Sequence, residues 1–511
     1  MSEIRLGLCE ATIGDVANEP VQQTAPVSDF VYVDIGSVDR ETKKILHAKE
    51  YELAQAPSRA KQVLKVGDVL VSMTRPNLNA VAQVPNELDG AIGSTGFHVL
   101  RSRWVESGYL FYLVQTDGFI DAMCDVVQGA LYPAVRPKDI SAFKFLLPPA
   151  AEQTRIVAKL EELLSDLDAG VAELKAAQKK LAQYRQSLLK AAVEGALTAD
   201  WRTRHTPAES GAQLLERILT ERRARWQARQ LDKFQAQGKT PPKDWQAKYP
   251  EPVAPDSTGW PELPQGWVWA SVEQVASDER YSLSIGPFGS NLKVPDYRET
   301  GVPLVFVRNI RSGNYGGAYT KYVTPDKAAE LHAHSVAAGD VLVTKMGEPP
   351  GDADVYPDEQ PLAVITADCI KVRCWPGLMA PHFLKSVINS HIGRRQIEPM
   401  TQGVAQKKVS LGRFTSLVVP LPSFEEQEYI MHVVSAADRD AVSQETAIQI
   451  ALRQSTAQRK NILQAAFSGQ LVPQDPADEP ASVLLARIRA ERAAQGAGGK
   501  LRRRNTKAGL T

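Results

Sequence analysis

Few residues in this 511-residue chain have the types and spacing that catalysis or metal binding requires. His332 and His334 carry imidazoles that could ligate a metal, but no third ligand lies near them in the sequence, which favours a surface loop. The run Gly286 to Ser290 (GPFGS) is glycine-rich, yet it follows no clear strand and opens no helix with a matching acidic residue. We expect a loop there as well, and neither segment predicts a catalytic centre.

Sequence signatures of cofactor binding are also missing. The chain has no glycine-rich loop after a strand with a downstream acidic residue for a methyl donor, and no G-x-x-x-x-G-K-[ST] phosphate loop. The Asn/Asp-Pro-Pro-aromatic tetrapeptide of adenine methyltransferases is absent too. We therefore predict a non-catalytic binding protein that holds no metal and no cofactor of its own.

The composition, with 43% hydrophobic and 23% charged residues, is typical of a soluble globular protein, and we expect the chain in the cytoplasm. The N-terminal sequence MSEIRLGLCE is too polar for a signal peptide, and no apolar run reaches the roughly 18 residues of a membrane span. Four cysteines do not make a disulfide framework in a chain of this size, so we expect reduced thiols at Cys9, Cys124, Cys369 and Cys374.

The net charge of +1 hides an uneven distribution. Lys and Arg collect between Lys175 and Arg229 and in the tail from Lys500 to Lys507 (KLRRRNTK). Solvated helix faces and a disordered tail explain most such runs, and the same runs permit a polyanionic partner.

The element that must position any binding surface is a heptad pattern from Glu152 to Gly195. Its leucines recur every seven residues, at Leu160, Leu167, Leu174, Leu181 and Leu188, and Val157, Leu164, Val171 and Ala192 fill the alternate positions. The pattern predicts one helix of roughly 60 to 65 Å with a narrow apolar stripe. A core helix of an ordinary bundle is the alternative. Gln178 and Arg185 on the stripe favour a coiled coil, where polar seam residues set register and partner.

The partner helix comes from an internal duplication. The pairs Gln128-Gly129 and Gln402-Gly403, Glu152-Gln153 and Glu426-Gln427, and the runs 185–197 and 459–471 are all separated by 274 residues. The second helix, from about Phe424 to Gly469, has a weaker seam of Met431, Val434, Ala441, Ile448, Leu452 and Ile462, interrupted by Asp438, Glu445 and Arg459. We predict an intramolecular antiparallel pair, with Arg185 facing Asp438 or Glu445.

Two mixed α/β globes accompany the helices, which gives an α+β fold with an internal pseudo-twofold repeat. A proline-rich connector at 238–264 is either a linker or a strap that lies on another surface. The predicted boundaries are 1–150 for the first globe, 151–200 for the central helix, 201–262 for an amphipathic segment and the linker, 263–422 for the second globe, 423–475 for the C-terminal helix, and 476–511 for a second amphipathic segment and the basic tail.

The helices of the two repeats match well, whereas the globes match poorly. Two different recognition surfaces on a rigid spacer would produce this pattern. DNA suits such a protein, because two separated half-sites can be read only if their spacing is fixed. A coiled-coil scaffold without sequence-specific DNA binding is one alternative, which retention on DNA would exclude. A single-chain methyltransferase or nuclease is another, which methyl transfer by the purified chain would support.

Several motifs, in an order that occurs twice, carry a family resemblance. They are the Gly-Asp-Val-Leu strands at 67–70 and 339–342, the Leu263-Pro264-x-Gly266-Trp267 segment, the two Gln-Gly turns, and the proline-rich Glu-Gln junctions at 146–153 and 419–427. On these motifs the chain resembles the specificity subunits of type I restriction-modification systems over nearly its whole length. The first globe lacks the Leu-Pro-x-Gly-Trp segment, so we expect its first strand to be shortened or differently closed.

The resemblance implies two target-recognition domains, each reading one half of an asymmetric split site in double-stranded DNA. The helical pair would fix the gap and dock two methyltransferase (M) subunits, which two restriction-translocase (R) subunits would join. S-adenosylmethionine, ATP and Mg²⁺ are then expected in those partners and not in this chain.

The bases are expected to be read from loops, because Arg pairs with guanine, Asn and Gln pair with adenine, and Lys neutralises phosphate. For each residue the alternative is a solvent-facing or turn-stabilising side chain. The candidates are Arg75, Asn77, Asn79, Gln128, Tyr132, Arg136 and Lys138 in the first globe, and Arg308, Asn309, Arg311, Lys345, Gln402, Gln406, Lys407 and Lys408 in the second.

Overall fold

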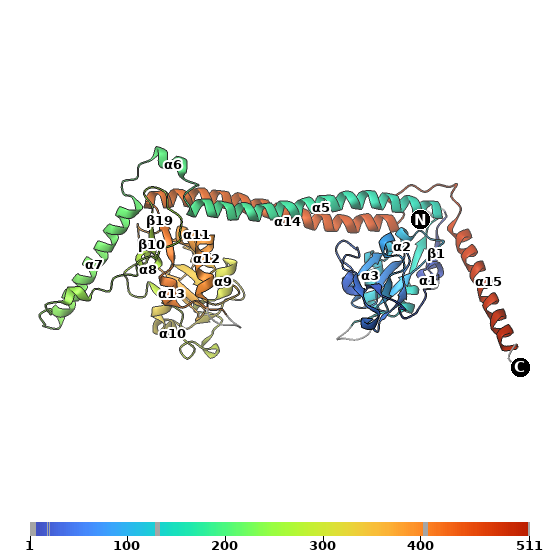
Figure 1. Ribbon diagram of the computed structural model, residues 1–511, viewed down its shortest axis with the longest axis horizontal. Helices are drawn as coiled ribbons and strands as arrows, with labels where there is room; N and C mark the ends of the chain where they lie inside the picture. The colour runs from blue at the N-terminus through green and yellow to red at the C-terminus, as the bar shows by residue number, and fades with distance from the viewer. Residues whose placement is uncertain (1–6, 18, 20, 128–132, 402–406, 509–511) are drawn as a thin grey trace. The chain divides into compact units, whose positions relative to one another are not determined.

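The computed structural model describes residues 7–17, 19, 21–127, 133–401 and 407–508, with side chains described as far as residue 494. The chain divides into two compact units (Figure 1). Unit 1 contains residues 1–176 and 448–511, and unit 2 contains residues 177–447. Each unit therefore combines one globe with the ends of two long helices.

The described residues of the unit 1 globe form three small sheets. An antiparallel pair joins β1 (Cys9–Thr12) to β9 (Lys144–Leu147). The four-stranded sheet has the order β3 (Lys49–Tyr51), β2 (Phe30–Val33), β7 (Ile92–Ser94), β4 (Ala60–Val63), and the three-stranded sheet has the order β6 (Val81–Gln83), β5 (Val69–Ser72), β8 (Phe97–Leu100). The helices are α1 (Ile13–Val16), α2 (Ser107–Leu113), α3 (Asp117–Asp125) and α4 (Pro137–Ser141), with 3-10 turns η1 (Ile35–Ser37), η2 (Leu53–Gln55), η3 (Pro76–Leu78) and η4 (Asn86–Leu88).

The globe of unit 2 has the same plan. Its antiparallel pair is β10 (Val268–Ser271) with β19 (Val418–Leu421). The two sheets have the orders β13 (Tyr322–Val323), β12 (Val302–Val305), β17 (Ala363–Ile365), β14 (Ser335–Val336), and β11 (Leu283–Ile285), β18 (Cys369–Val372), β15 (Val341–Thr344), β16 (Ala353–Val355). The helices are α8 (Val272–Val275), α9 (Val307–Ser312), α10 (Pro325–Glu330), α11 (Pro381–Asn389), α12 (His391–Met400) and α13 (Leu411–Thr415), with 3-10 turns η6 (Val294–Asp296) and η7 (His332–His334).

The strand orders show that the two globes are copies of one framework. In both, the inner two strands of one four-stranded sheet, β2 with β7 and β12 with β17, run parallel. The pairs β1/β9 and β10/β19 close the two globes alike, each with four residues in register. The expectation that the first strand would be shortened or differently closed is therefore wrong, because four residues of backbone pairing form without the Leu-Pro-x-Gly-Trp segment. Within the described residues of unit 1, the three-stranded sheet has no counterpart of strand β11.

The two long helices are α5 (Ala150–Val193) and α14 (Phe424–Phe467), of 44 residues each. They run antiparallel, and part of each helix lies in each unit (Figure 1). In unit 1, Leu160 and Leu164 share a buried core with Leu463 and Ala466, and in unit 2 Ala192 and Val193 share one with Ile430. The predicted helical pair and the α+β fold class are confirmed.

The seam positions are less exposed than their helical neighbours. Leu160 is fully buried, and partial burial is found at Leu167, Leu174, Leu181, Leu188, Val434, Ile448, Leu452 and Ile462. Arg185 binds both acids that the sequence offered as alternatives. Its Nη1 lies 2.7 Å from Glu445 Oε2, and its Nε lies 3.3 Å from Asp438 Oδ1. In unit 1, the duplicated Arg459 pairs with Asp168.

The segment after each long helix packs on the globe where that helix ends. In unit 2, α6 (Ala199–Arg204) leads to α7 (Gly211–Ala236), whose Leu214, Leu215 and Ile218 enter the core. In unit 1, α15 (Ala481–Ala508) buries the equivalent Leu484, Leu485 and Ile488. Each amphipathic stripe thus completes a globe.

The proline-rich connector of unit 2 lies on its globe as a strap. Its 3-10 turn η5 (Trp245–Lys248) stacks Trp245 on Trp226 of α7, with ring centroids 5.9 Å apart. Further along, Val253 O accepts a hydrogen bond of 2.6 Å from Ser271 Oγ. Of the two possibilities left open by the sequence, the structure therefore selects the strap.

The Glu-Gln junctions fasten each long helix to its globe. Gln153 Oε1 accepts from Glu106 N (3.2 Å), the N-cap of α2, and Gln427 Oε1 accepts from Ala380 N (2.8 Å), the N-cap of α11. The amide nitrogen of each glutamine donates back to a carbonyl at the start of its own helix, Pro148 O and Pro422 O. Both glutamines are fully buried, so these hydrogen bonds are needed to satisfy their amides.

Candidate nucleic-acid interface

In each globe the candidate surface is the loop that follows one inner strand. In unit 1 this is β5, the middle strand of the three-stranded sheet, and in unit 2 it is β15, an inner strand of the sheet β11-β18-β15-β16. We call residues 73–79 loop 1 and residues 345–351 loop 2. Each loop pairs with a distant segment that the sequence also singled out. Arg75 N donates to Pro133 O and Val135 N to Met73 O (2.8 Å each), and Val409 N donates to Lys345 O (3.0 Å). The fold therefore brings together the two groups of candidates in each globe.

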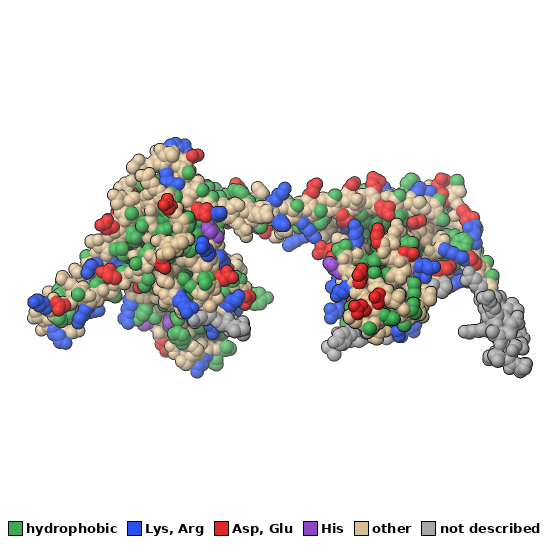
Figure 2. Space-filling view, in the orientation of Figure 1, with side chains coloured by type: hydrophobic (Ala, Val, Ile, Leu, Met, Phe, Trp, Pro, Cys, Tyr) green, Lys and Arg blue, Asp and Glu red, His purple; other side chains and the backbone are tan. Residues whose placement is uncertain are grey.

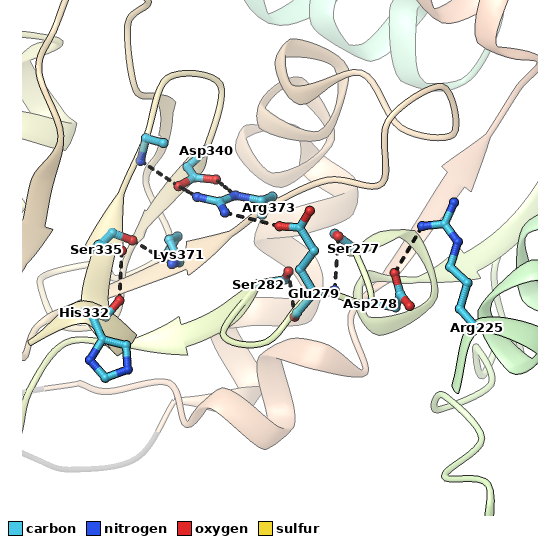
Figure 3. A network of polar contacts seen from close by, with 11 residues as sticks. Arg225, Ser277, Asp278, Glu279, Ser282, His332, Ser335, Asp340, Lys371 and Arg373 are labelled. Atoms are coloured by element: carbon cyan, nitrogen blue, oxygen red, sulfur yellow. Dashed lines mark hydrogen bonds and ion pairs between the residues drawn. The ribbon is translucent and has the colours of Figure 1, made fainter. Parts of the chain in front are cut away.

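An ion pair with a buried aspartate supports the strand before each loop. Asp68 is bound by Arg101, with Nε 2.6 Å from Oδ1, and Asp340 is bound by Arg373, with Nε 2.8 Å from Oδ1 (Figure 3). The glycine before each acid has a φ of +80°, a turn conformation that glycine adopts without steric cost. The Gly-Asp motif is therefore structural: it closes the turn and anchors the strand that presents the loop.

Some of the first-globe candidates are exposed and free to contact DNA, and others make contacts within the protein. Arg75, Asn77 and Lys138 are exposed. Arg136 is also exposed, but its guanidinium forms two hydrogen bonds with Asp139 at the start of α4. Gln128 and Tyr132 lie outside the described residues.

The second-globe candidates are divided in the same way. Arg308 and Lys408 are exposed, and the Arg308 guanidinium lies 4.3 Å from the centre of the Phe306 ring. Lys345 and Lys407 are half-buried, and Lys407 Nζ lies 3.1 Å from Glu348 Oε1. Gln402 and Gln406 lie outside the described residues. Figure 2 shows Lys and Arg side chains mixed with Asp and Glu on the visible surface of each unit.

Asn79 and Asn309 were predicted to read bases, but in the structure both side chains are buried and make hydrogen bonds inside the protein. Asn79 is 9% exposed, and its Nδ2 donates to Val114 O at 2.8 Å. Asn309 is 8% exposed; its Oδ1 accepts from Phe306 N and its Nδ2 donates to Asn314 O. An amide whose donors and acceptors are already used inside the fold is not available to an adenine edge.

The GPFGS segment supplies a residue that the sequence reasoning did not select. The segment is a loop, as expected, but it directly follows β11, so the statement that no strand precedes it is wrong. Phe288 at its tip is 67% exposed, and Lys345 Nζ lies 5.6 Å from its ring centre. An exposed aromatic ring beside a lysine suits contact with nucleic acid. The signal in the sequence was the phenylalanine between two glycines.

The histidine pair does not form a metal site. His334 donates from Nδ1 to Ile285 O at 2.6 Å, and burial lowers its pKa. The carbonyl of His332 accepts from Ser335 Oγ, and Figure 3 shows its ring turned away from the Asp340 cluster. Among the residues that the structure describes, no group of His, Cys, Asp and Glu is arranged to hold a metal ion. Over the same residues, no helix is long and apolar enough to cross a membrane.

Asp352, the residue directly after loop 2, is held by two arginines. Burial would raise the pKa of Asp352, but hydrogen bonds from Arg394 (2.6 Å) and Arg311 (2.8 Å) outweigh it and lower the pKa from its ordinary 3.8. A lowered folded-state pKa means that Asp352 stabilises the fold above pH of about 4, and that this contribution is lost as the pH falls through the lowered pKa.

We expect Asp352→Asn to reduce the free energy of unfolding at pH 7 by about 1 kcal/mol, because the bridge between the two guanidiniums loses its charge. The difference from wild type should shrink as the pH is lowered below about 4, where the wild-type carboxylate is protonated too. Urea unfolding of both proteins at pH 7 and at low pH measures this. A difference that does not vary with pH would contradict it.

Comparisons with known proteins identify relatives over most of the chain. No protein-family model matches it. The chain is 25% identical over 358 residues to the type I restriction enzyme EcoBI specificity subunit of Escherichia coli, covering 68% of this chain and 65% of that subunit, just under two thirds of its length. It is 24% identical over 416 residues to the EcoDI specificity subunit of the same species, covering 78% of this chain and 80% of that subunit.

A solved structure shares the fold. That structure was determined to explain complex assembly and conformational transition of the type I R-M system. Its chain aligns with a TM-score of 0.64 and 22% identity, over 92% of this chain and 100% of that chain. In sequence this protein is similar to the specificity subunits of type I restriction enzymes, and the solved structure shows that it shares the fold of that chain.

Proposed function

We propose that this chain is the DNA sequence-specificity subunit of a type I restriction-modification complex. The observation that carries the proposal is the pair of globes with one framework and different loops. Loop 1 presents Arg75 and Asn77, whereas loop 2 begins with Lys345 and lies beside Lys407 and Lys408. Each globe is then a target-recognition domain that reads one half of a bipartite, asymmetric site.

The exposed side chains suit different parts of DNA. The guanidinium of Arg75 can bind the O6 and N7 acceptors of guanine, and the amide of Asn77 can bind the N6 and N7 groups of adenine. Lys345, Lys407 and Lys408 suit phosphates, and Phe288 can make apolar contact with a thymine methyl group. On this proposal the first domain depends more on base edges and the second combines phosphate contacts with an aromatic surface.

The proposed role is non-catalytic and depends on partner subunits. Two adenine-methyltransferase subunits would dock on the helical pair and two restriction-translocase subunits would join them, with S-adenosylmethionine, ATP and Mg²⁺ bound in those partners. The proposed DNA substrate places the complex in the cytoplasm. The helical pair would fix the gap between the two half-sites.

Methylation mapping tests the proposal. The chain is co-expressed with its methyltransferase subunit, and methylated adenines are mapped across the host genome, with and without this chain. We expect a split, asymmetric motif that disappears when the chain is deleted. Methylation that does not depend on the chain would overturn the proposal in favour of a scaffold, and methyl transfer by the purified chain alone would show an enzyme.

The lysines beside loop 2 give a second test. We expect the double variant Lys407→Ala and Lys408→Ala to weaken binding to all DNA sequences and to flatten the plot of log affinity against log salt, by about 0.9 for each phosphate that the variant no longer neutralises. Lys408→Ala alone should account for more of the weakening, because Lys407 already pairs with Glu348. Titrations at several salt concentrations measure the slope. Altered base preference with an unchanged slope would show that these lysines read bases.

A further inference from the structure

Loop 1 has a backbone conformation that one of its residues, Arg75, does not favour. Arg75 has a φ of +50° and Asn79 a φ of +42°, both in the left-handed region, which arginine rarely adopts and asparagine adopts more readily. These two residues lie on either side of the 3-10 turn Pro76–Leu78. A loop held in this conformation needs contacts from outside it, and those contacts decide how Arg75 and Asn77 are presented.

Lys43 supplies one of these contacts. Its Nζ donates to Asn79 O at 2.6 Å and to Asn79 Oδ1 at 3.0 Å, while Asn79 Nδ2 is fixed on Val114 O. Lys43 lies in a turn after β2 that is itself held by Asp39, whose Oδ1 accepts from Thr42 N and Oγ1. Burial, assisted by the nearby positive charge of Arg459, lowers the pKa of Lys43 to about 8. The ammonium group is therefore directed at the loop and away from bulk water.

Arg311 does the same for loop 2 by different chemistry. Its Nη2 donates to Pro349 O and its Nε to Asp352 Oδ2, both at 2.8 Å. Arg394 completes the brace from α12, with Nη2 2.6 Å from Asp352 Oδ1. The guanidinium of Arg311 is thus engaged on two edges by the loop and the residue that follows it.

The two cations lie on the segments that follow corresponding strands, at different positions along those segments. Lys43 follows β2 and Arg311 follows β12, and these strands occupy the same position in the orders β3-β2-β7-β4 and β13-β12-β17-β14. The side chains and the bonded atoms differ, but in each domain one cation from this segment binds a main-chain carbonyl of the loop after the inner strand, β5 or β15. Each loop is thus braced by a cation from the corresponding segment.

We infer that Lys43 and Arg311 are positioning residues that set the base specificity of their own recognition domains by holding loop 1 and loop 2, without contacting DNA. The inference rests on the proposed function and deepens it. It assigns Arg311 a different role from the base-reading candidates. It also predicts that specificity in each half of the site depends on a cation whose hydrogen bonds are made to the protein and not to DNA.

The test uses the full complex and maps methylation for Lys43→Ala and Arg311→Ala. We expect each variant to lose discrimination, on the order of tenfold at one or more base pairs, in one half of the motif only, and the two variants to affect opposite halves. Each variant is thus the matched control for the other. Lys43→Arg and Arg311→Lys should restore part of the discrimination, because each keeps a cationic donor.

Lys44→Ala serves as a further control, since Lys44 is the exposed neighbour of Lys43, and it should leave the motif unchanged. A uniform fall in methylation with the bases of both halves unchanged would overturn the inference. It would show that the cations support folding or DNA affinity only. A wild-type complex that gives no split motif would instead overturn the proposed function.

Hydrogen exchange tests the positioning role without DNA. In the full chain, Lys43→Ala should speed exchange of the amides in residues 73–80 at least several-fold, while Lys44→Ala should not. Thermal unfolding of the same samples shows whether the variant has remained folded, and Lys43→Arg provides a milder change if it has not. Unchanged exchange in a folded Lys43→Ala protein would overturn the inference whatever the protein's action on DNA.

Discussion

Replacing Glu426 with alanine is expected to lower the free energy of unfolding by about 3–5 kcal/mol, because it removes the charged partner of a buried ion pair. Glu426 is 2% exposed. Its Oε1 accepts hydrogen bonds of 2.6 Å from Thr198 Oγ1 and from Arg202 Nη1, and its Oε2 accepts one of 2.9 Å from Trp267 Nε1. The variant leaves three buried or half-buried donors without this acceptor.

Urea unfolding measures this loss of stability. Glu425→Ala is the matched control, because Glu425 is the exposed acid beside it in the first turn of α14, and we expect it to cost less than about 1 kcal/mol. Equal losses in the two variants would contradict the role assigned to Glu426. Glu426 ties the segment after α5 to Trp267, which directly precedes the first strand of the second globe.

Asp68→Ala is the second large effect, with an expected loss of about 3 kcal/mol. The Asp68 side chain is 1% exposed, and it binds a guanidinium, that of Arg101, which is 13% exposed. Its Oδ2 also accepts from Lys65 N at 2.8 Å, which closes the turn before β5. The variant therefore removes both the ion pair and the turn hydrogen bond that support loop 1.

Asp340, the equivalent acid in the second globe, provides the comparison with Asp68. Asp340→Ala removes the equivalent acid, but its partner Arg373 is 35% exposed and lies 3.4 Å from Glu279 Oε2, so solvent and a second acid can compensate. We expect a smaller loss there, of about 1–2 kcal/mol. Denaturant unfolding of the two variants decides the order, and a larger loss for Asp340→Ala would contradict the reasoning from burial.

The helical pair shows what a local sequence pattern can predict. A seam at every third and fourth residue is a property of consecutive residues, so the positions of Leu160 to Leu188 sufficed to predict α5. Charge complementarity then placed Arg185 against the acids of the second helix. The structure added that Arg185 binds Glu445 and Asp438 together.

The candidate interface shows what a local sequence pattern cannot predict, which is whether a loop side chain is exposed. Residue type and a loop position selected Arg75, Asn77, Asn79 and Asn309 alike, although the structure exposes the first two and buries the asparagines at positions 79 and 309. Lys43 was not selected, because nothing in its neighbourhood in the sequence connects it with Asn79, 36 residues away. Phe288 lies in a segment that the sequence singled out only as a loop.

The sequence by itself determined the duplication, the two long helices, their antiparallel pairing and the resemblance to type I specificity subunits. Each of these follows from periodicity, or from the order of motifs along the chain. The tertiary structure alone decided which loop side chains face solvent, which cation braces each loop, and that α7 and α15 complete the cores of the globes. The physical reason is that burial and hydrogen-bond partners are set by residues far apart in the sequence, so a polar residue's role depends on neighbours that only the fold supplies.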